Sequence, residues 1–235
     1  MTFLTEKMTM PAMKLELRDN VHVLTLTEGD TENKLTQEVV EEYLAHLDEV
    51  EKYQGNTALM ITCEHEKTMS TGINLEWLGA QDQDGLMKFV KTLEQLLVRL
   101  ALLDMPTVAA INGNCYAGGA IIMSAVDFRF MRSDRGRFCY PEVNINIPFT
   151  LVMQDIVGLM PNKKMLKEMC LLGRALTGEE ALQGDVVDGL FAMDELQQKT
   201  FEYAQLLAQK DRATYAQIKR QMRPDIEKHR ETLFA

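Results

Sequence analysis

The chain has 235 residues and a formal net charge of −10, and 46% of its residues are hydrophobic. This length can bury a sizeable core, as one domain or as one domain with a small appendage. The acidic balance argues against a nucleic-acid-binding surface, because phosphate contacts need clustered lysine and arginine. No segment approaches the roughly twenty apolar residues of a membrane span, so we expect no membrane insertion.

The cysteines and the chain ends bear on the compartment. The four cysteines form no CxxC pair and show no metal-ligand spacing; they are Cys63, Cys115, Cys139 and Cys170. This pattern is typical of reduced, buried thiols in a cytosolic-type protein, and we expect no bound metal. The first ten residues lack the basic start and apolar core of a signal peptide, and the last four are not a peroxisomal address. We therefore expect a cytoplasmic protein.

The first hundred residues alternate predicted strands and helices. Period-two alternation with a turn at residues 18–20 predicts an antiparallel hairpin. Thr36 is a plausible helix N-cap, and the apolar residues after it recur at helical spacing. The predicted elements are strands at 14–19 and 22–27, a helix at 35–52, a buried strand at 58–63, an irregular loop at 67–79 and a second long helix from about Leu86 to Leu103.

The second half continues the alternation and then becomes all-helical. Alternating strands and helices imply right-handed crossovers and a mostly parallel sheet, so the predicted fold class is α/β. We expect an α/β core over residues 1–193. A helical region over 194–235 is too short for its own core, so it packs on the main body or on a neighbouring subunit. The predicted elements are strands at 107–111 and 187–191 and helices at 196–209, 213–222 and 224–233.

Residues 105–149 carry the features that predict chemistry. Paired glycines at Ala117-Gly118-Gly119, between two apolar runs, predict a tight strand-to-helix turn with unpaired N–H groups at the positive end of a helix. Further along, Glu142 stands inside an apolar, strand-like segment, where poor solvation raises a carboxyl pKa. An anion-binding backbone and a poorly solvated carboxylate together suggest proton transfer next to a carbonyl.

Plainer interpretations of the same residues exist. Gly118 and Gly119 can simply let a helix pack closely on a strand. Glu142 can be an edge-strand glutamate that faces water or an arginine such as Arg135 or Arg137. Only the combination of the paired glycines and the Glu142 carboxylate in one stretch favours a functional site.

Four motifs of the central stretch together resemble the enoyl-CoA hydratase/isomerase (crotonase) superfamily. The resemblance continues more loosely from about Lys14 to the C-terminal helices. It implies a crotonase-like fold of repeated β-β-α turns with a C-terminal helical region. It also implies an acyl-CoA thioester as substrate, coenzyme A only as part of that substrate, no other cofactor, and a homotrimer or dimer of trimers. The motifs are residues 105–113 (MPTVAAING), Ala117-Gly118-Gly119, Asp127-Phe128-Arg129 and Pro141-Glu142-Val143.

The resemblance also implies roles for single residues. The backbone N–H groups of Thr71 and Gly118 would form an oxyanion hole, and Glu142 would be the catalytic base. The residues implied in substrate and coenzyme A binding are Ser70, Gly72, Asn74, Leu75 and Lys34, and those implied in the acyl pocket are Trp77, Cys115, Tyr116 and Ile121. For three of them a structural role stays open: Lys34 as a solvated lysine, Cys115 as a packed thiol and Trp77 as core.

Ile121 is the informative departure from the family pattern. Hydratases of this family carry a second glutamate at this position, where it shares a water molecule with the later glutamate. With one carboxylate left, the pattern resembles the Δ3,Δ2-enoyl-CoA isomerase branch, and we expect an isomerase that moves a proton from C2 to C4 through Glu142. The alternatives are another crotonase-type reaction (decarboxylation, thioester hydrolysis or hydration) and a non-catalytic acyl-CoA-binding protein.

Overall fold

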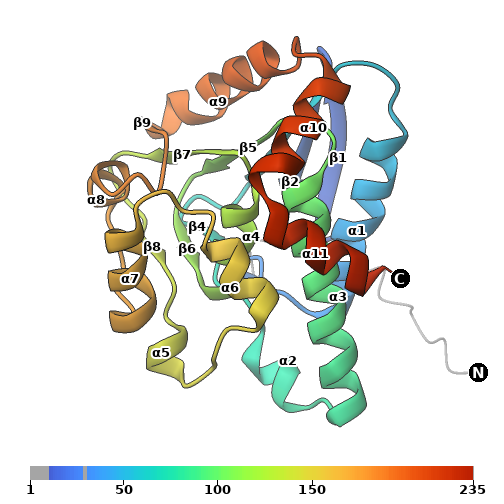
Figure 1. Ribbon diagram of the computed structural model, residues 1–235. Helices are drawn as coiled ribbons and strands as arrows, with labels where there is room; N and C mark the ends of the chain where they lie inside the picture. The colour runs from blue at the N-terminus through green and yellow to red at the C-terminus, as the bar shows by residue number, and fades with distance from the viewer. Residues whose placement is uncertain (1–10, 29–30, 235) are drawn as a thin grey trace, which may run out of the picture.

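The computed structural model describes residues 11–28 and 31–234, and a six-stranded sheet lies at its centre (Figure 1). The strand order is β1-β2-β3-β5-β7-β9. β1 and β2 are antiparallel and all other neighbours are parallel, as the alternation of strands and helices predicted. The strands are β1 (Met13–Arg18), β2 (Val21–Leu26), β3 (Ala58–Cys63), β5 (Thr107–Ile111), β7 (Phe128–Arg132) and β9 (Gly189–Phe191).

The predicted hairpin is confirmed, and the last predicted strand is shorter than expected. Asp19 and Asn20 both have positive φ, which places the turn between β1 and β2. The strand expected at 187–191 begins only at Gly189. Val186 and Val187 instead donate their N–H groups to the carbonyl of Ala181, so they belong to the turn that follows a helix.

The segment 67–79 is more ordered than the irregular loop that was predicted. It contains the strand β4 (Thr68–Ser70) and the short helix α2 (Leu75–Gly79). β4 pairs in parallel with β6 (Asn114–Tyr116), and β6 pairs with β8 (Phe138–Cys139), which makes a second, three-stranded sheet. Strands of two or three residues carry too little alternation to be recognised in a sequence. This small sheet joins three segments that contribute to the candidate site described below.

Helices cover both faces of the large sheet. Along β5, Val108 and Ala110 face a core that includes residues of α9, while Ala109 and Ile111 face the larger core. The larger core includes α1 and α3, and α9 lies on the opposite face (Figure 1). The helices are α1 (Gln37–Lys52), α3 (Gln83–Leu102), α4 (Ala117–Ala125), α5 (Glu142–Ile145), α6 (Leu151–Val157), α7 (Lys163–Leu172), α8 (Gly178–Gln183), α9 (Met193–Leu207), α10 (Arg212–Met222) and α11 (Pro224–Leu233).

A buried charge cluster fastens the C-terminal helices to the core. Lys219 and Arg223 place their side-chain nitrogens 2.8 and 2.9 Å from the two carboxylate oxygens of Asp127, which lies just before β7. The hydroxyl of Tyr215 and the N–H of Thr107 donate to the same carboxylate, at 3.0 and 2.9 Å. α10 and α11 thereby pack on α3, and α11 also packs on α6.

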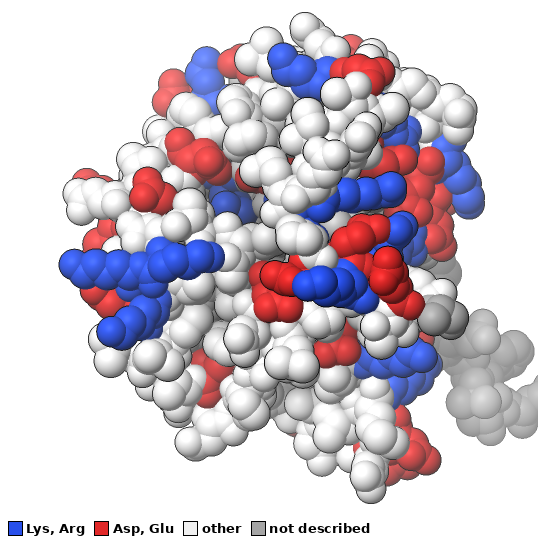
Figure 2. Space-filling view, viewed as in Figure 1, with Lys and Arg blue, Asp and Glu red and all other residues white. Residues whose placement is uncertain are grey.

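Charged side chains of both signs lie beside one another on the visible surface. Figure 2 shows basic side chains next to acidic ones on this face, without a continuous basic stripe. Within the described residues, no helix combines the length and apolar character that crossing a membrane requires.

Candidate active site

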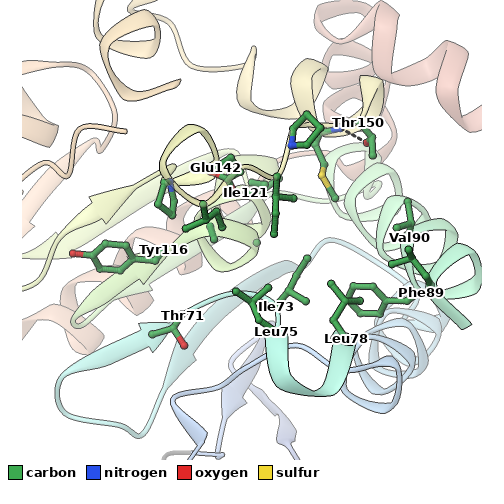
Figure 3. Close-up of a pocket in the computed structure, with 18 residues that line it drawn as sticks. Thr71, Ile73, Leu75, Leu78, Phe89, Val90, Tyr116, Ile121, Glu142 and Thr150 are labelled. Carbon is green, nitrogen blue, oxygen red and sulfur yellow. Dashed lines mark hydrogen bonds between the residues drawn. The ribbon is translucent and has the colours of Figure 1, made fainter. Parts of the chain in front are cut away.

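An apolar cavity of about 490 Å³ lies between α2, α3, α4, α5 and α6 (Figure 3). Most of its wall is hydrocarbon, and only four of the side chains that line it carry a polar atom: Thr71, Tyr116, Glu142 and Thr150. The remaining lining residues are Ile73, Leu75, Leu78, Leu86, Phe89, Val90, Ala117, Gly118, Ile121, Pro141, Ile145, Ile147, Pro148 and Met153.

Glu142 enters this cavity from α5, not from a strand. The sequence predicted a strand-like segment, and the structure corrects this: Glu142 is the first residue of a one-turn helix that ends at Asn146 in the left-handed conformation. The N–H groups of Asn144 and Ile145 bond to the carbonyl of Pro141, which closes the turn. A four-residue helix is too short to show helical periodicity, so the apolar residues around Glu142 resembled a strand.

The Glu142 carboxyl is buried and poorly satisfied. The residue is 7% exposed, and its Oε2 has no hydrogen-bond partner among the described residues. Burial raises the pKa of this carboxyl from 4.5 to about 7, while a hydrogen bond from its own backbone N–H lowers it. The alternative of a glutamate facing water is therefore wrong. Arg137, named as a possible partner of Glu142, instead lies 4.0 Å from the carboxylate of Glu180. A carboxyl with a pKa near neutrality can both accept and return a proton.

The N-terminus of α4 lines the same cavity as Glu142. Ala117 begins this helix with φ +47°, a left-handed conformation that a residue with a Cβ seldom adopts. The N–H of Gly118, in the first turn, has no hydrogen-bond partner among the described residues, as is usual at a helix N-terminus. Gly118 therefore presents a free donor at the positive end of α4, as the sequence predicted.

The structure corrects the other predicted donor, Thr71. The N–H of Thr71 is not free, because it bonds to the carbonyl of Glu32 at 3.2 Å. Thr71 does line the cavity, and its hydroxyl oxygen is buried without a partner, but it cannot offer its N–H to a ligand while the bond to Glu32 is formed. The assignment of the first oxyanion donor to Thr71 is therefore wrong in this structure.

Ile73, two residues further on, has the free N–H instead. The carbonyl of Leu35 accepts the N–H of Asn74 at 2.9 Å, and the N–H of Leu35 donates to the carbonyl of Gly72 at 2.9 Å. This short parallel ladder therefore uses the backbone groups of the residues on either side of Ile73. In a parallel ladder the N–H of the residue between those two points away from the partner strand. For Ile73 no acceptor is found among the described residues, and its side chain lines the cavity.

Close packing of glycines brings the two donors together. Gly72 has φ +84°, and a Cβ on it would lie 2.7 Å from the nitrogen of Gly118. A Cβ on Gly119 would lie 2.6 Å from the Cβ of Ser70. The close-packing interpretation of the glycines is thus correct, and it coexists with their place beside the donors.

Ser70 acts within the protein rather than at the cavity surface. Its hydroxyl donates to the carbonyl of Asn33 at 2.8 Å and accepts the N–H of Gly72 at 3.1 Å. The side chain of Asn74 caps α2 by accepting the N–H of Trp77. Neither Ser70, Gly72 nor Asn74 lines the cavity, so the structure shows them shaping the loop that carries Ile73.

The other predicted residues divide into two groups. Leu75, Tyr116 and Ile121 line the cavity. Three do not: Lys34 is half-buried with its Nζ 3.9 Å from the carboxylate of Glu32, Trp77 packs edge-on against Phe89, and Cys115 is fully buried in the core, where burial raises its thiol pKa. For these three the structural interpretation is the one that the structure supports.

Sequence reasoning missed one wall of the cavity. The residues of this wall come from α2, α3, α5, the segment after α5, and α6, and none of them was assigned to the site: Leu78, Leu86, Phe89, Val90, Ile145, Ile147, Pro148, Thr150 and Met153. In the sequence, the apolar stripe of the second long helix was visible, but it indicated only a buried face. Which part of that face meets core and which part meets a cavity is decided by tertiary packing. No group of metal-ligating side chains occurs among the described residues.

The enoyl-CoA hydratase/isomerase family profile matches residues 16–235, almost the whole chain. The chain belongs to this family. A curated relative, enoyl-CoA delta isomerase 3 of Arabidopsis thaliana, is 29% identical over 220 residues, which cover 90% of this chain and 92% of the relative. The crotonase fold predicted from the motifs is thereby confirmed, and the names of this relative and of a second one, enoyl-CoA delta isomerase 2 of Arabidopsis thaliana (30% identical), agree with the predicted resemblance to the isomerase branch.

Solved structures agree on the fold. Human mitochondrial delta3-delta2-enoyl-CoA isomerase superposes with a TM-score of 0.85 at 22% identity, covering 94% of this chain and 86% of that one. A probable enoyl-CoA hydratase from Mycobacterium tuberculosis reaches 0.85 at 21% identity, covering 92% and 89%. The predicted trimeric assembly, the cytoplasmic location and the lack of a further cofactor stay predictions.

Proposed function

We propose that the protein is an enoyl-CoA isomerase that converts a 3-enoyl-CoA into the conjugated 2-enoyl-CoA. The observation that carries the proposal is the Glu142 carboxyl: among the described residues that line the cavity it is the one acid, its pKa is raised to about 7, and its Oε2 has no partner. The names of isomerases among the relatives support the same reaction.

The proposed reaction begins at the thioester. The N–H groups of Ile73 and Gly118 would hold the thioester oxygen, where negative charge develops when C2 loses its proton. Such donors typically contribute about 3–4 kcal/mol each to lowering the barrier. Glu142 would take the C2 proton and become a neutral acid, which suits its dry surroundings. It would then give the same proton to C4, so that the double bond moves from C3–C4 to C2–C3 and the oxyanion returns to a carbonyl.

Ile121 favours isomerisation over hydration. This side chain is 2% exposed and lines the same cavity as Glu142 (Figure 3). Hydration needs a water molecule that is oriented and deprotonated beside the double bond, and an aliphatic side chain offers no hydrogen bond for that purpose. A single proton-transfer group in an apolar wall suits a reaction in which water takes no part.

The proposal is tested with two substrates on the same enzyme preparation. We expect a 3-enoyl-CoA to be converted to its conjugated isomer, seen as rising ultraviolet absorbance of the 2-enoyl thioester. With the 2-enoyl-CoA as substrate, we expect hydration to be at least about a hundredfold slower, because one carboxylate is missing. Faster hydration than isomerisation would establish a hydratase, and turnover of neither substrate would favour the non-catalytic acyl-CoA-binding alternative.

A further inference from the structure

We propose that Tyr140 and Ser124 are positioning residues, and that their paired hydroxyls fix the separation between Glu142 and the backbone donor at Gly118. This inference rests on the proposed function, because it concerns how the same site is held for proton transfer. Neither Tyr140 nor Ser124 lines the cavity, so both would act through the residues that do.

The segment that carries Glu142 has few backbone ties to the rest of the protein. The strand β8 ends at Cys139, and Pro141 has no N–H group with which the ladder could continue. The hydrogen bonds of the following turn stay within it, because Asn144 and Ile145 both donate to the carbonyl of Pro141. Side-chain contacts must therefore hold the start of α5 in place.

Tyr140, two residues before Glu142, provides such a contact. It is the largest of the fully buried side chains among the described residues. Its ring packs edge-on against Phe138 and Phe149, with ring centroids 5.7 and 6.2 Å apart. Its hydroxyl oxygen lies 2.5 Å from the Oγ of Ser124. Tyr140 therefore ties the segment of Glu142 to the helix that carries Ser124.

Ser124 extends this link along α4 toward the oxyanion donor. It is 0% exposed, and its hydroxyl donates to the carbonyl of Ala120 at 2.7 Å. Because the single hydroxyl hydrogen of Ser124 is used there, the hydrogen between the two hydroxyls comes from Tyr140. Ala120 lies two residues after Gly118, in the first turn of α4. Two hydrogen bonds thus connect the segment of Glu142 with the turn that carries Gly118.

The other end of α4 is held by a buried arginine. The Nη1 of Arg129 donates to the carbonyl of Val126, at the C-terminus of α4, at 2.9 Å and to that of Met123 at 3.4 Å. Its Nε donates to the carbonyl of Val186 at 2.8 Å. A helix that is held in this way is a firm reference, against which Tyr140 can set the position of Glu142.

A hydrogen bond suits this task better than an apolar contact does. A buried hydroxyl costs free energy unless it is paired, and its bond has a preferred length and direction. Proton transfer needs such precision, since a misplacement of about 1 Å can lower a rate by about 10²-fold. A phenylalanine at position 140 would fill nearly the same volume but would leave the separation of Glu142 and α4 less closely defined.

The test compares Tyr140→Phe, Ser124→Ala and the double variant in isomerisation of a 3-enoyl-CoA. Each single variant should lower kcat by about tenfold, with KM changed less than about threefold, because the cavity wall is kept. The double variant should be no more than about twofold slower than either, since all three break one link. Tyr215→Phe is the matched control: it removes a hydroxyl that bonds to Asp127, outside the cavity, and should keep the full kcat.

Urea unfolding of the same preparations separates positioning from folding. A role in stability alone would lower the free energy of unfolding and leave kcat per folded molecule unchanged, and this result would overturn the inference. Losses of kcat that multiply in the double variant would also overturn it. Each single variant breaks the link by itself, so either one that folds suffices for the test.

A 3-thia-acyl-CoA ester separates this inference from the proposed isomerisation. It has no double bond to move, and its sulfur acidifies C2. In D₂O, Glu142 would take the C2 proton, exchange it for a deuteron from the solvent and return that deuteron to C2. The rate of deuterium uptake therefore reports on Glu142 and the backbone donors alone.

The two reactions together give distinct outcomes. Deuterium uptake that is about tenfold slower in Tyr140→Phe, without isomerisation of any 3-enoyl-CoA, would support the inference and overturn the proposed function. Isomerisation and uptake at full rate in both single variants would overturn the inference and leave the proposed function standing. A wild-type protein that catalyses neither reaction would overturn both.

Discussion

Two buried carboxylates in this protein have opposite surroundings. Asp127 has a side chain that is 7% exposed, and it receives Lys219, Arg223, Tyr215 and the N–H of Thr107 within 3.0 Å. Glu142 is 7% exposed as a whole residue, but its Oε2 has no partner among the described residues. A carboxylate that is fully paired holds elements together, whereas burial without a partner raises the pKa of a carboxyl and leaves it free for proton transfer. The comparison predicts that one residue governs stability and the other governs the rate.

The largest expected effect is on the rate, from Glu142→Gln. Because the amide cannot take up the C2 proton, we expect kcat for isomerisation to fall by about 10³-fold or more. The unfolding free energy above neutral pH should not decrease, because the substitution removes a buried, unpaired charge. Steady-state kinetics and denaturant unfolding of the same preparation measure both quantities. Glu49→Gln, at an exposed site on α1, is the charge-matched control. A Glu142→Gln enzyme that works at the full rate would show that Glu142 is not the catalytic base.

The next effect is on stability, from Asp127→Asn. The amide keeps the shape but leaves the buried Lys219 and Arg223 without their counter-charge, and breaking a buried pair in this way costs about 3–5 kcal/mol. We expect the free energy of unfolding in urea to drop by about 3 kcal/mol, with kcat per folded molecule changed less than about twofold. A normal stability with a large loss of kcat would reverse the contrast between the two carboxylates.

A smaller effect on the rate is expected from Gly72→Ala. The added Cβ would lie 2.7 Å from the nitrogen of Gly118 at a residue with φ +84°, so the loop and the donors at Ile73 and Gly118 must shift. Loss of one such donor lowers kcat by about 10²–10³-fold. Gly79→Ala is the matched control on α2, since a Cβ there meets nothing within 4 Å. Equal kcat for the two variants would argue against donors at this position.

The smallest expected effect is the pH dependence of stability that Glu142 causes. The folded pKa of about 7 lies above the ordinary 4.5, so the folded state binds more protons than the unfolded state between these values. The stabilisation is complete below about pH 4.5 and is lost as the pH rises through about 7. Between about pH 6 and about pH 8 it amounts to about 1 kcal/mol. Urea unfolding at both pH values should show this difference in the wild type and not in Glu142→Gln.

Much of this arrangement could be predicted from the sequence. The α/β order, the hairpin, the turn at Gly118 and the carboxylate at Glu142 follow from local patterns and from the family resemblance. The donor at Ile73 could not be separated from Thr71, because the difference is a hydrogen bond to Glu32, nearly forty residues away in the chain. Short elements such as α5 carry too few residues for a periodic signal.

The cavity wall that includes residues of α3 and α6 could not be predicted from the sequence for a related reason. Phe89 and Met153 are apolar residues on amphipathic helices, and nothing local distinguishes a side chain that meets a cavity from one that meets the core. Trp77 illustrates the opposite error, since it was assigned to the acyl pocket and instead packs on Phe89 behind the wall. Both errors concern residues whose role depends on contacts between distant segments.

The ionisation of the Glu142 carboxyl tests the central claim most directly. Carbon-13 NMR of protein labelled at glutamate carboxyls can follow this group through a pH titration, and the signal that Glu142→Gln lacks identifies it. An unpaired carboxyl in an apolar cavity should titrate with a midpoint of about 7, and kcat/KM should rise with the same midpoint as the base becomes ionised. A midpoint near the ordinary 4.5 would show a solvated or paired carboxylate and would contradict the account.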